Sequence, residues 1–352
     1  MMKKIFWTSL AGLTVLTACG GGENLGDESD SANESDELVI STWGFAEDFF
    51  RAEVFTPFEE EHGVTIVLDT GNNAERLSRV EQGSSKVDLI YLSDYYAQQG
   101  IEADLFETID RENIPNLADI YDVAKAPTGE EYGPAYTIAQ FGIAYHPDRT
   151  DKDISSWADL WDAELERNIT IPGITTTSGP MFLDAASRVA GNETFNEDEA
   201  FTQLADLNPN IVTEYEGTSE FVNMFVQGEV AAGPIMEMFF ADVQESVPEA
   251  QFISPEEGGY AVINTVNIVK DSENKELAEA FIDWILSEEV QRAAALAKID
   301  SPVHTSLNLT EEEAEGITYG DDVIESLIVL DMSFVNENND HWIDRWNREF
   351  AQ

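Results

Sequence analysis

Cysteine is almost absent from this chain of 352 residues. Its single cysteine, Cys19, has no partner for an internal disulfide, so the folded part must be stabilised by its core. Hydrophobic residues at 43% and aromatic residues at 10% can supply that core, and they exclude a chain that is disordered throughout. Beyond the first residues, no apolar run reaches the roughly 20 residues that a membrane-spanning helix needs.

Basic residues are also scarce. The chain has 18 Lys and Arg against 70 Asp and Glu, which gives a formal net charge of -52 at pH 7. A field of this sign repels nucleic acid and anionic membranes, so we expect neither as a partner. Two explanations are open for the acidity: a pocket that attracts cations, or an acidic surface suited to a salty or alkaline environment. Because the acidic residues are spread along the whole chain, the second explanation is favoured.

Catalytic patterns are missing as well. The four histidines, His62, His146, His304 and His341, are scattered, and none has metal-ligand spacing or an evident nucleophile beside it. No G-x-S-x-G nucleophile elbow occurs. We therefore expect no catalytic residue, no metal and no cofactor. A secreted enzyme stays open as an alternative, as does a structural or adhesive protein, although no internal repeats support the latter.

The first 19 residues have the form of an export signal. Lys3 and Lys4 precede an apolar run, and the letters LTAC at 16–19 close the segment with small residues before the cysteine. This ending resembles the lipobox of bacterial lipoproteins, which implies export, cleavage before Cys19 and lipid attachment to its sulfur. An ordinary signal peptide with an incidental cysteine is the alternative. Residues 20–37, glycine-rich at the start and strongly acidic, predict a disordered tether.

The rest of the chain alternates strand and helix patterns. Apolar strands at 38–43, 64–68 and 87–92 are separated by helical patterns, which predicts an α/β fold with parallel strands and right-handed crossovers. The third strand runs into Ser93 and Asp94, residue types that cap helix starts. Ligands of open α/β sheets collect at such carboxyl ends of strands. We therefore expect a binding site where this strand meets the following helix.

Two extended apolar segments, residues 132–147 and 260–269, predict crossings between two lobes that enclose a cleft. Between them, the hydroxyl residues 175–178 precede Gly-Pro at a helix start and form a second candidate binding turn. The predicted segments are lobe 1 over 38–137, lobe 2 over 138–262, and a return to lobe 1 with C-terminal helices over 263–352.

In this order, the features resemble the extracellular solute-binding proteins of ABC importers, and most closely the spermidine/putrescine-binding group. The resemblance rests on the lipobox, on Trp43 after the first strand, and on LSDYY at 92–96, SSWADLWD at 155–162, QGEVAAG at 227–233, EEGGYAVINTVNIV at 256–269 and ELAEAFIDWILSEEVQ at 276–291. It implies a type II periplasmic-binding-protein fold, in which two α/β lobes joined by two crossover strands close on a solute like a hinge.

The resemblance supplies only part of a binding site. Trp43, Ser93 and Tyr95 stand where the polyamine binders place an aromatic wall, a hydroxyl and a second aromatic, and such a wall suits an ammonium group or an alkyl chain. A tryptophan and an aspartate of that group are replaced here by Met236 and Asn264. An acidic pair is replaced by Thr and Ser. The predicted ligand-binding residues are Trp43, Ser93, Asp94, Tyr95, Thr177, Ser178, Met236, Glu237 and Asn264.

Neutral groups at these positions argue for a solute less cationic than a diamine, because a buried diammonium needs fixed carboxylates. A polyamine or related amine, a zwitterionic or anionic solute such as an amino acid derivative or a phosphonate, and ferric ion all stay open. The sequence thus predicts the monomeric solute-binding component of an ABC importer, anchored by lipid on Cys19 to the outer face of the cell membrane, that delivers a small solute to the membrane permease.

Overall fold

Strands and helices alternate along the part of the chain that the computed structural model describes, residues 37–84 and 86–350. The predicted leader, the predicted lipid site at Cys19 and the predicted tether up to residue 36 lie outside these residues. Glu37, the last residue of the predicted tether, is already the first residue of a strand. Within the described ranges, no helix is both long enough and apolar enough to cross a membrane.

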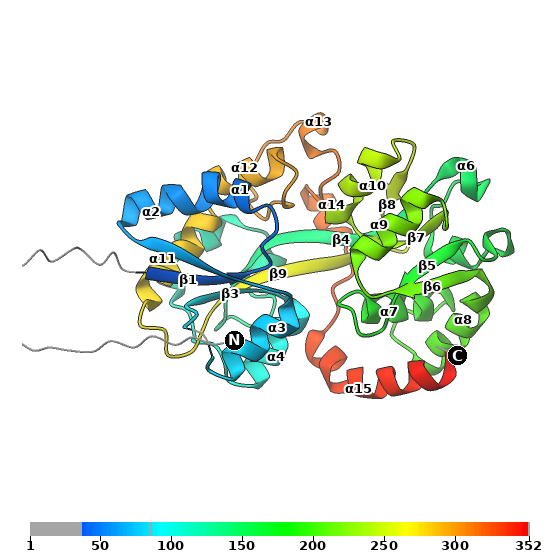
Figure 1. Cartoon of the computed structure of the whole chain (residues 1–352), viewed down its shortest axis with the longest axis horizontal. Coiled ribbons are helices and arrows are strands. Elements are labelled where there is room, and N and C mark those ends of the chain that lie inside the picture. Colours follow the sequence, from blue (N-terminus) through cyan, green and yellow to red (C-terminus); the bar gives the residue numbers. More distant parts are fainter. Residues whose placement is uncertain (1–36, 85, 351–352) are drawn as a thin grey trace, which may run out of the picture. The chain divides into compact units, whose positions relative to one another are not determined.

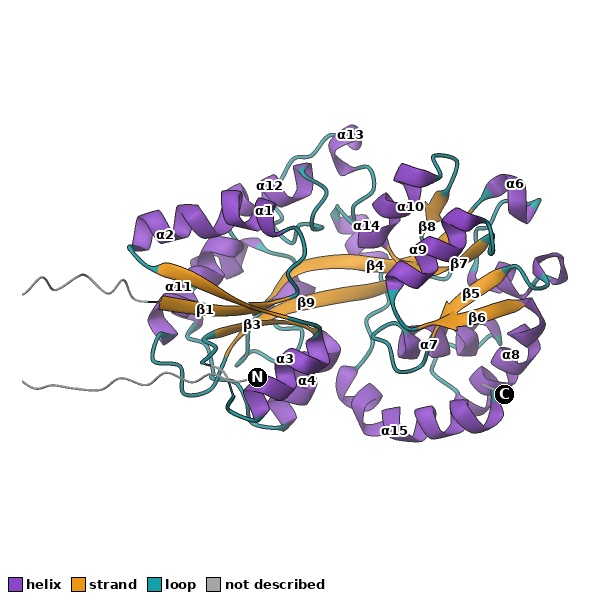
Figure 2. Ribbon diagram, in the orientation of Figure 1, coloured by secondary structure: helices purple, strands orange, loops and turns teal. Residues whose placement is uncertain are grey.

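The elements are labelled in Figure 1 and coloured by type in Figure 2. The strands are β1 (Glu37–Thr42), β2 (Thr65–Thr70), β3 (Leu89–Ser93), β4 (Ala135–Tyr145), β5 (Ile169–Pro172), β6 (Ile211–Tyr215), β7 (Ala232–Met236), β8 (Gln251–Ile253) and β9 (Tyr260–Ile268). The α-helices are α1 (Glu47–Phe50), α2 (Thr56–His62), α3 (Asn73–Glu81), α4 (Asp94–Glu102), α5 (Asp122–Lys125), α6 (Pro147–Thr150), α7 (Gly179–Val189), α8 (Glu197–Leu207), α9 (Thr218–Gln227), α10 (Phe240–Ser246), α11 (Lys275–Ile285), α12 (Glu288–Leu296), α13 (Glu311–Ala314), α14 (Asp321–Ser326) and α15 (Met332–Glu349). The π-helix η1 (Arg51–Phe55) joins α1 to α2, and the 3-10 helices are η2 (Arg111–Asn113), η3 (Pro115–Asp119), η4 (Trp157–Trp161), η5 (Ala163–Leu165), η6 (Asn208–Asn210) and η7 (Glu237–Phe239).

Two long antiparallel strands, β4 and β9, connect the two lobes. The strand order is β2-β1-β3-β9-β4-β7-β5-β6, with β8 paired to β4. The first half of β4 pairs with β9, as in Ile138 with Ile263, whereas its second half pairs with β7, as in Tyr145 with Ala232. Figure 2 shows both strands passing from one lobe to the other. The predicted α/β fold with two crossover strands is confirmed.

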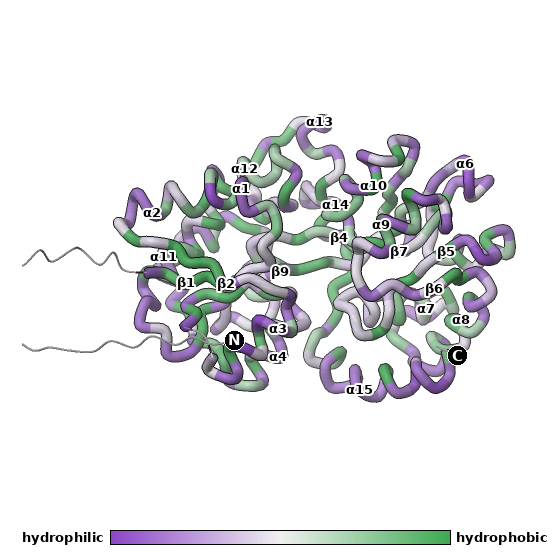
Figure 3. Tube along the Cα trace, viewed as in Figure 1, coloured by the Kyte–Doolittle hydropathy of each residue, from purple (hydrophilic) through white to green (hydrophobic). Residues whose placement is uncertain are grey.

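The strands of lobe 1 send alternate side chains to two different cores. Leu38 and Ile40 of β1 lie in a core with Phe55, Phe58 and residues of α11, on the face covered by η1, α2, α11 and α12. Val39, between them, packs toward the core on the opposite face, which α3 and α4 cover. Because side chains on a strand alternate between faces, this pattern requires helices on both sides of the sheet. The apolar strands consequently lie inside the lobe in Figure 3.

Lobe 2 has the same layered construction. The helices α7 and α8 cover one face of β5 and β7, where Ile169 and Ile171 meet Phe182 in one apolar core. The helices α9 and α10 cover the other face, where Phe221 and Phe225 pack in a second core. Each lobe is therefore a sheet between helices, and the carboxyl ends of its parallel strands are left for a site.

The last helix, α15, packs on lobe 2. Trp342 and Trp346 are buried in the core of α7 and α8, and Trp346 Nε1 donates to Glu214 Oε2 at 3.0 Å. Arg345 Nη1 lies 2.6 Å from Glu197 Oε1 on α8. Figure 1 shows α15, in red, running along lobe 2 with its first turns toward α4. The same helix also contacts lobe 1, because Asn336 Nδ2 donates to Tyr95 O on α4 at 3.1 Å. The lobe boundaries expected from the sequence stay a prediction.

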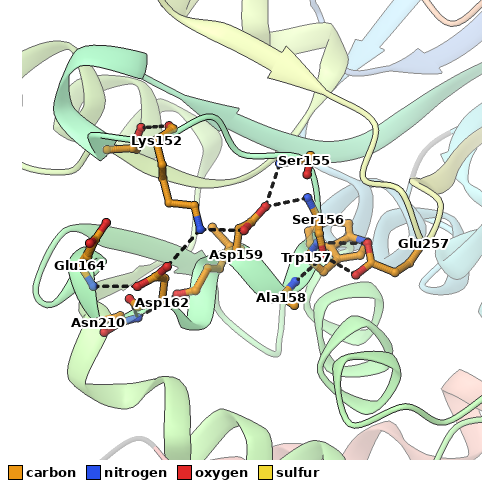
Figure 4. Close-up of polar contacts among 12 residues, drawn as sticks. Lys152, Ser155, Ser156, Trp157, Ala158, Asp159, Asp162, Glu164, Asn210 and Glu257 are labelled. Carbon is orange, nitrogen blue, oxygen red and sulfur yellow. Dashed lines mark hydrogen bonds and ion pairs between the residues drawn. The ribbon is translucent and has the colours of Figure 1, made fainter.

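The motif SSWADLWD forms η4 and holds the loop that leads into β9. Ser156 caps η4, and the Asp159 carboxylate accepts from Ser156 N at 3.0 Å. Lys152 Nζ lies 2.8 Å from Asp159 Oδ1 and also pairs with Asp162 (Figure 4). From the loop before β9, Glu257 accepts from Trp157 N at 3.2 Å and from the Ser156 hydroxyl. This network fixes the entry of the return crossing to lobe 2.

Candidate functional site

A cleft of ≈ 590 Å³ is lined by residues of both lobes. Lobe 1 contributes the loops after β1, β2 and β3, and lobe 2 contributes the loops after β5, β6 and β7. Val262 and Asn264 of the crossover strand β9 also line it. The cleft therefore lies at the carboxyl ends of strands, where the α/β pattern of the sequence predicts a site.

Trp43 forms an aromatic wall in lobe 1, and a buried arginine supports it. The Arg76 guanidinium lies 4.8 Å from the centre of the Trp43 ring. Arg76 is fully buried, and its side chain donates to Ser41 O at 3.1 Å, to Tyr91 O at 2.6 Å and to Gly71 O at 2.9 Å. Burial lowers the pKa of Arg76 to about 10. The guanidinium thus ties three chain segments together behind Trp43.

Ser93 ends β3 and lines the cleft, but it does not cap α4. Its side chain makes no cap hydrogen bond, contrary to the expectation from its position before a helix. The residue is only 3% exposed, and its Oγ has no hydrogen-bond partner within the described structure. A buried polar atom without a partner is costly, so this hydroxyl is available to a bound molecule.

Two residues that were predicted beside Ser93 do not line the cleft. Asp94 is buried in the first turn of α4, where its Oδ1 accepts from Tyr95 N at 2.8 Å, and burial raises the pKa of its carboxyl to about 7. Tyr95 packs on α15, where its hydroxyl accepts from Asn339 Nδ2 at 2.8 Å. Its neighbour Tyr96 lines the cleft instead. Because successive residues of a helix point about 100° apart, a choice between adjacent tyrosines needs the structure.

Of the predicted ligand-binding residues, Thr177, Ser178, Met236 and Asn264 line the cleft. The hydroxyl turn is already engaged by protein groups: Thr176 Oγ1 donates to Gly173 O at 2.8 Å and accepts from Gly179 N at 3.1 Å. Thr175 Oγ1 donates to Glu216 Oε2 at 2.8 Å. The Glu216 carboxylate from the neighbouring loop therefore lies against the hydroxyl turn and gives this part of the cleft a negative charge.

Glu237 is a predicted site residue that lies behind the cleft wall. It is only 6% exposed and does not line the cleft. Its Oε1 accepts from Gln140 Nε2 of the crossover strand β4 at 3.3 Å, and its Oε2 accepts from the Thr318 hydroxyl. Burial raises the pKa of this carboxyl. Glu237 thus joins η7 to a crossover strand.

Two carboxylates of the cleft are absent from the sequence-based prediction. Glu216 follows β6 directly, so the rule that pointed to Ser93 after β3 could have found it. Asp300 follows α12 in an irregular segment that gives no periodic signal, and only the folded chain brings it to the cleft. Burial raises the pKa of Asp300 to about 7. Among the described residues that line the cleft, none is Lys, Arg or His.

The arrangement of two lobes, two crossover strands and an interlobe cleft agrees with the comparisons with known proteins. The model of a family described as bacterial extracellular solute-binding protein matches residues 84–326. The chain belongs to this family.

In the described ranges, no group of three or more His, Cys, Asp or Glu is placed to hold a metal ion.

Individual proteins are also similar to this chain over most of its length. A crystal structure of an ABC transporter from Clostridium perfringens is 43% identical, covers 89% of this chain and 99% of its own, and superposes with a TM-score of 0.81. The spermidine/putrescine-binding periplasmic protein of Escherichia coli is 23% identical over 78% of this chain and 80% of its own. The spermidine/putrescine substrate-binding protein PotD from Streptococcus pneumoniae shares the fold, with a TM-score of 0.74, 22% identity, and coverage of 88% of this chain and 98% of its own.

Proposed function

We propose that this family member is the solute-binding component of an ABC importer and that it captures a cationic amine, of the polyamine class, in the interlobe cleft. The observation that carries the proposal is the charge of the cleft. Glu216 and Asp300 line it, and no basic side chain of the described structure does. The names of the Escherichia coli and Streptococcus pneumoniae relatives support the same solute class.

The physical reason is the cost of burying an ammonium group. A cation that leaves water for a cleft needs a carboxylate or an aromatic face in place of its hydration shell. Met236, Asn264 and the hydroxyl turn are neutral, which argues from the sequence against a dication. In the fold, however, Glu216 and Asp300 supply negative charge from other positions, and Trp43 supplies an aromatic face. These side chains favour the amine over an anionic solute.

Further parts of the proposal concern how the protein works in the cell. The chain is exported, cleaved before Cys19 and held by lipid at the outer face of the cell membrane, where it acts as a monomer. Closure of the lobes on the solute prepares its delivery to the membrane permease. The solute leaves unchanged, because the protein binds it without catalysis.

A zwitterion that carries one amine and one carboxylate is a second candidate. The unpartnered hydroxyl of Ser93 favours it, because a buried hydroxyl can donate to a carboxylate. Such a solute would place its amine at a cleft carboxylate and its own carboxylate at the lobe 1 hydroxyl.

A thermal-shift panel separates these candidates. Residues 1–35 are removed, because they are not part of the main compact unit of the chain. The truncated protein is heated with putrescine, spermidine, 4-aminobutyrate or succinate. Stabilisation follows RT ln(1 + [L]/Kd), about 2.7 kcal/mol at a ligand concentration of 100 Kd. We expect the two polyamines to raise Tm and to be recovered unchanged. A rise with succinate alone, or chemical turnover of any compound, would overturn the proposal.

A further inference from the structure

We propose that Asp300 and Glu216 are the two anchors of a single dication, one in each lobe. One ammonium group binds Asp300 in the wall of lobe 1, and the second binds Glu216 at the rim of lobe 2. A diamine therefore bridges the two lobes, whereas a monoamine occupies Asp300 alone. This inference rests on the proposed function and adds to it which side chains recognise the solute and why two charges are required.

The segment that carries Asp300 is fixed to the crossover strand. Thr137 Oγ1 of β4 donates to Ser301 O at 2.8 Å, and Ser301 Oγ accepts from Thr318 N at 3.0 Å. Val303 N donates to Gln291 Oε1 of α12 at 2.7 Å. These hydrogen bonds hold the chain directly after Asp300, so the carboxylate is positioned before a ligand arrives. Such preorganisation reduces the entropy cost of binding.

The Asp300 carboxylate has no cationic partner in the part of the chain that the structure describes. Among the ion pairs of the described residues, none includes it. The titratable groups that interact with it are Tyr91 on β3 and Tyr136 on β4, and the Arg76 guanidinium on α3 interacts with Tyr136. A partly desolvated carboxylate among apolar and phenolic groups gains most from an ammonium, because the ammonium replaces the lost hydration.

Glu216 is in a different environment. It is exposed in the turn between β6 and α9, and one of its oxygens accepts from Thr175 Oγ1 at 2.8 Å. Water screens an ion pair at such a position, so we expect its contribution to be smaller and more sensitive to salt. Glu216 and Asp300 thus differ in strength as well as in lobe, and the deeper carboxylate binds the first ammonium.

Calorimetric titration with putrescine and butylamine, which differ by one amine, tests the inference. At pH 8 we expect the purified protein to bind putrescine about tenfold or more tighter than butylamine, which is the gain from one additional charge-assisted contact. Asp300→Asn should weaken both ligands by about tenfold to a hundredfold, for the same reason. Glu216→Gln should reduce putrescine affinity to the level of butylamine and leave butylamine unchanged.

The controls distinguish this inference from the proposed function. Asp206→Asn removes an exposed carboxylate of α8 outside the cleft and should change neither affinity, which tests for a general effect of net charge. A cooperative unfolding transition of the free Asp300→Asn protein, at or above the wild-type Tm, shows that the variant is folded. If the wild-type protein binds neither amine, the proposed function is wrong. If it binds putrescine but Asp300→Asn does so equally well, or if Glu216→Gln weakens both amines alike, the two-anchor inference is wrong.

A pH series gives a readout that a structural role of Asp300 would not produce. Because the carboxyl must be ionised to bind an ammonium, butylamine affinity should fall about tenfold per pH unit below pH 7. The Asp300→Asn variant should lose this dependence. An equal pH dependence in both proteins would contradict the assignment of the anchor.

Discussion

The two walls of the cleft hold their polar groups in opposite ways. In lobe 1, the Trp43 ring rests on a buried guanidinium, the Ser93 hydroxyl has no partner within the described structure, and Asp300 has no counter-ion there. In lobe 2, the hydroxyl turn is bonded within itself and to Glu216, which is exposed to solvent. Lobe 1 thus presents a buried hydroxyl without a partner and a carboxylate without a counter-ion among the described residues, whereas the polar groups of the lobe 2 turn are bonded to each other and to Glu216.

This difference indicates that the two lobes contribute differently to solute affinity. Buried groups without partners gain the most from a ligand, so lobe 1 should supply most of the affinity. Solvent-exposed groups such as Glu216 gain when the lobes close and exclude water, so lobe 2 should contribute to closure and selectivity. Changes on the lobe 1 side should therefore have larger effects than matched changes on the lobe 2 side.

The largest expected effect concerns the frame behind Trp43. In Arg76→Met, the carbonyls that accept from the guanidinium lose their donors, so we expect the free energy of unfolding to fall by about 3 kcal/mol. Arg79→Met is the matched control, because Arg79 is partly exposed and its ion pair with Asp69 should contribute less than about 1 kcal/mol. Urea unfolding measures both values. Equal losses would show that the buried arginine does not support the wall.

The next effect distinguishes the two walls by affinity. Trp43→Ala should weaken amine binding by about tenfold to a hundredfold, because the cation-facing ring is lost. Met238→Ala, a truncation on the lobe 2 side of the same cleft, should weaken it by less than about threefold. Calorimetric titration of both variants with putrescine measures the two losses of affinity. A larger loss in Met238→Ala would reverse the assignment of the walls.

Replacing Asp94 should have a smaller effect, which concerns the free energy of unfolding and its pH dependence. Its pKa in the folded protein, about 7, is above the unfolded value of 3.8, so folding disfavours its charged form. The contribution of the neutral Asp94 carboxyl to the free energy of unfolding is thus fully present below about pH 4, and it is lost as the pH rises through 7. Asp94→Asn should be more stable than wild type at pH 8 by about 1–2 kcal/mol, with the difference closing toward pH 4. Stability curves that stay parallel at all pH values would be inconsistent with a buried, uncompensated carboxylate.

The smallest effect separates two adjacent tyrosines. Tyr95→Phe removes the hydrogen bond to Asn339 on α15 and should lower stability by about 1 kcal/mol, while amine affinity changes less than about twofold. Tyr96→Leu alters the cleft lining and should have the opposite profile, with weaker binding and nearly unchanged stability. Unfolding and titration of both variants check the pair. Weaker binding in Tyr95→Phe would return Tyr95 to the site.

Much of the fold follows from local patterns in the sequence. The apolar strands, the amphipathic helices and the two extended crossings depend on residues close together in the chain, so periodicity and helix-start residues suffice to predict them. The position of α15 does not follow, because the burial of Trp342 and Trp346 is consistent with either lobe until the chain is folded.

The site was only partly predictable, because some of its residues are brought together only by the folded chain. Trp43, Ser93, Thr177, Ser178, Met236 and Asn264 follow from strand ends and from the family resemblance, and all line the cleft. Tyr95 was predicted from the family resemblance, and Glu237 is adjacent to a position that the resemblance marks, but the direction of a side chain depends on its neighbours in space. Asp300 comes from an irregular segment that long-range hydrogen bonds hold against β4, and no sequence pattern marks it.

A crystal structure with bound putrescine would show whether Asp300 and Glu216 hold the two amines of one ligand. We expect one nitrogen about 2.7–2.9 Å from an Asp300 carboxylate oxygen, the methylene chain against Trp43, and the second nitrogen near Glu216 across a closed cleft. A diamine with neither nitrogen within hydrogen-bond distance of Asp300, or bound wholly against lobe 2, would contradict the account.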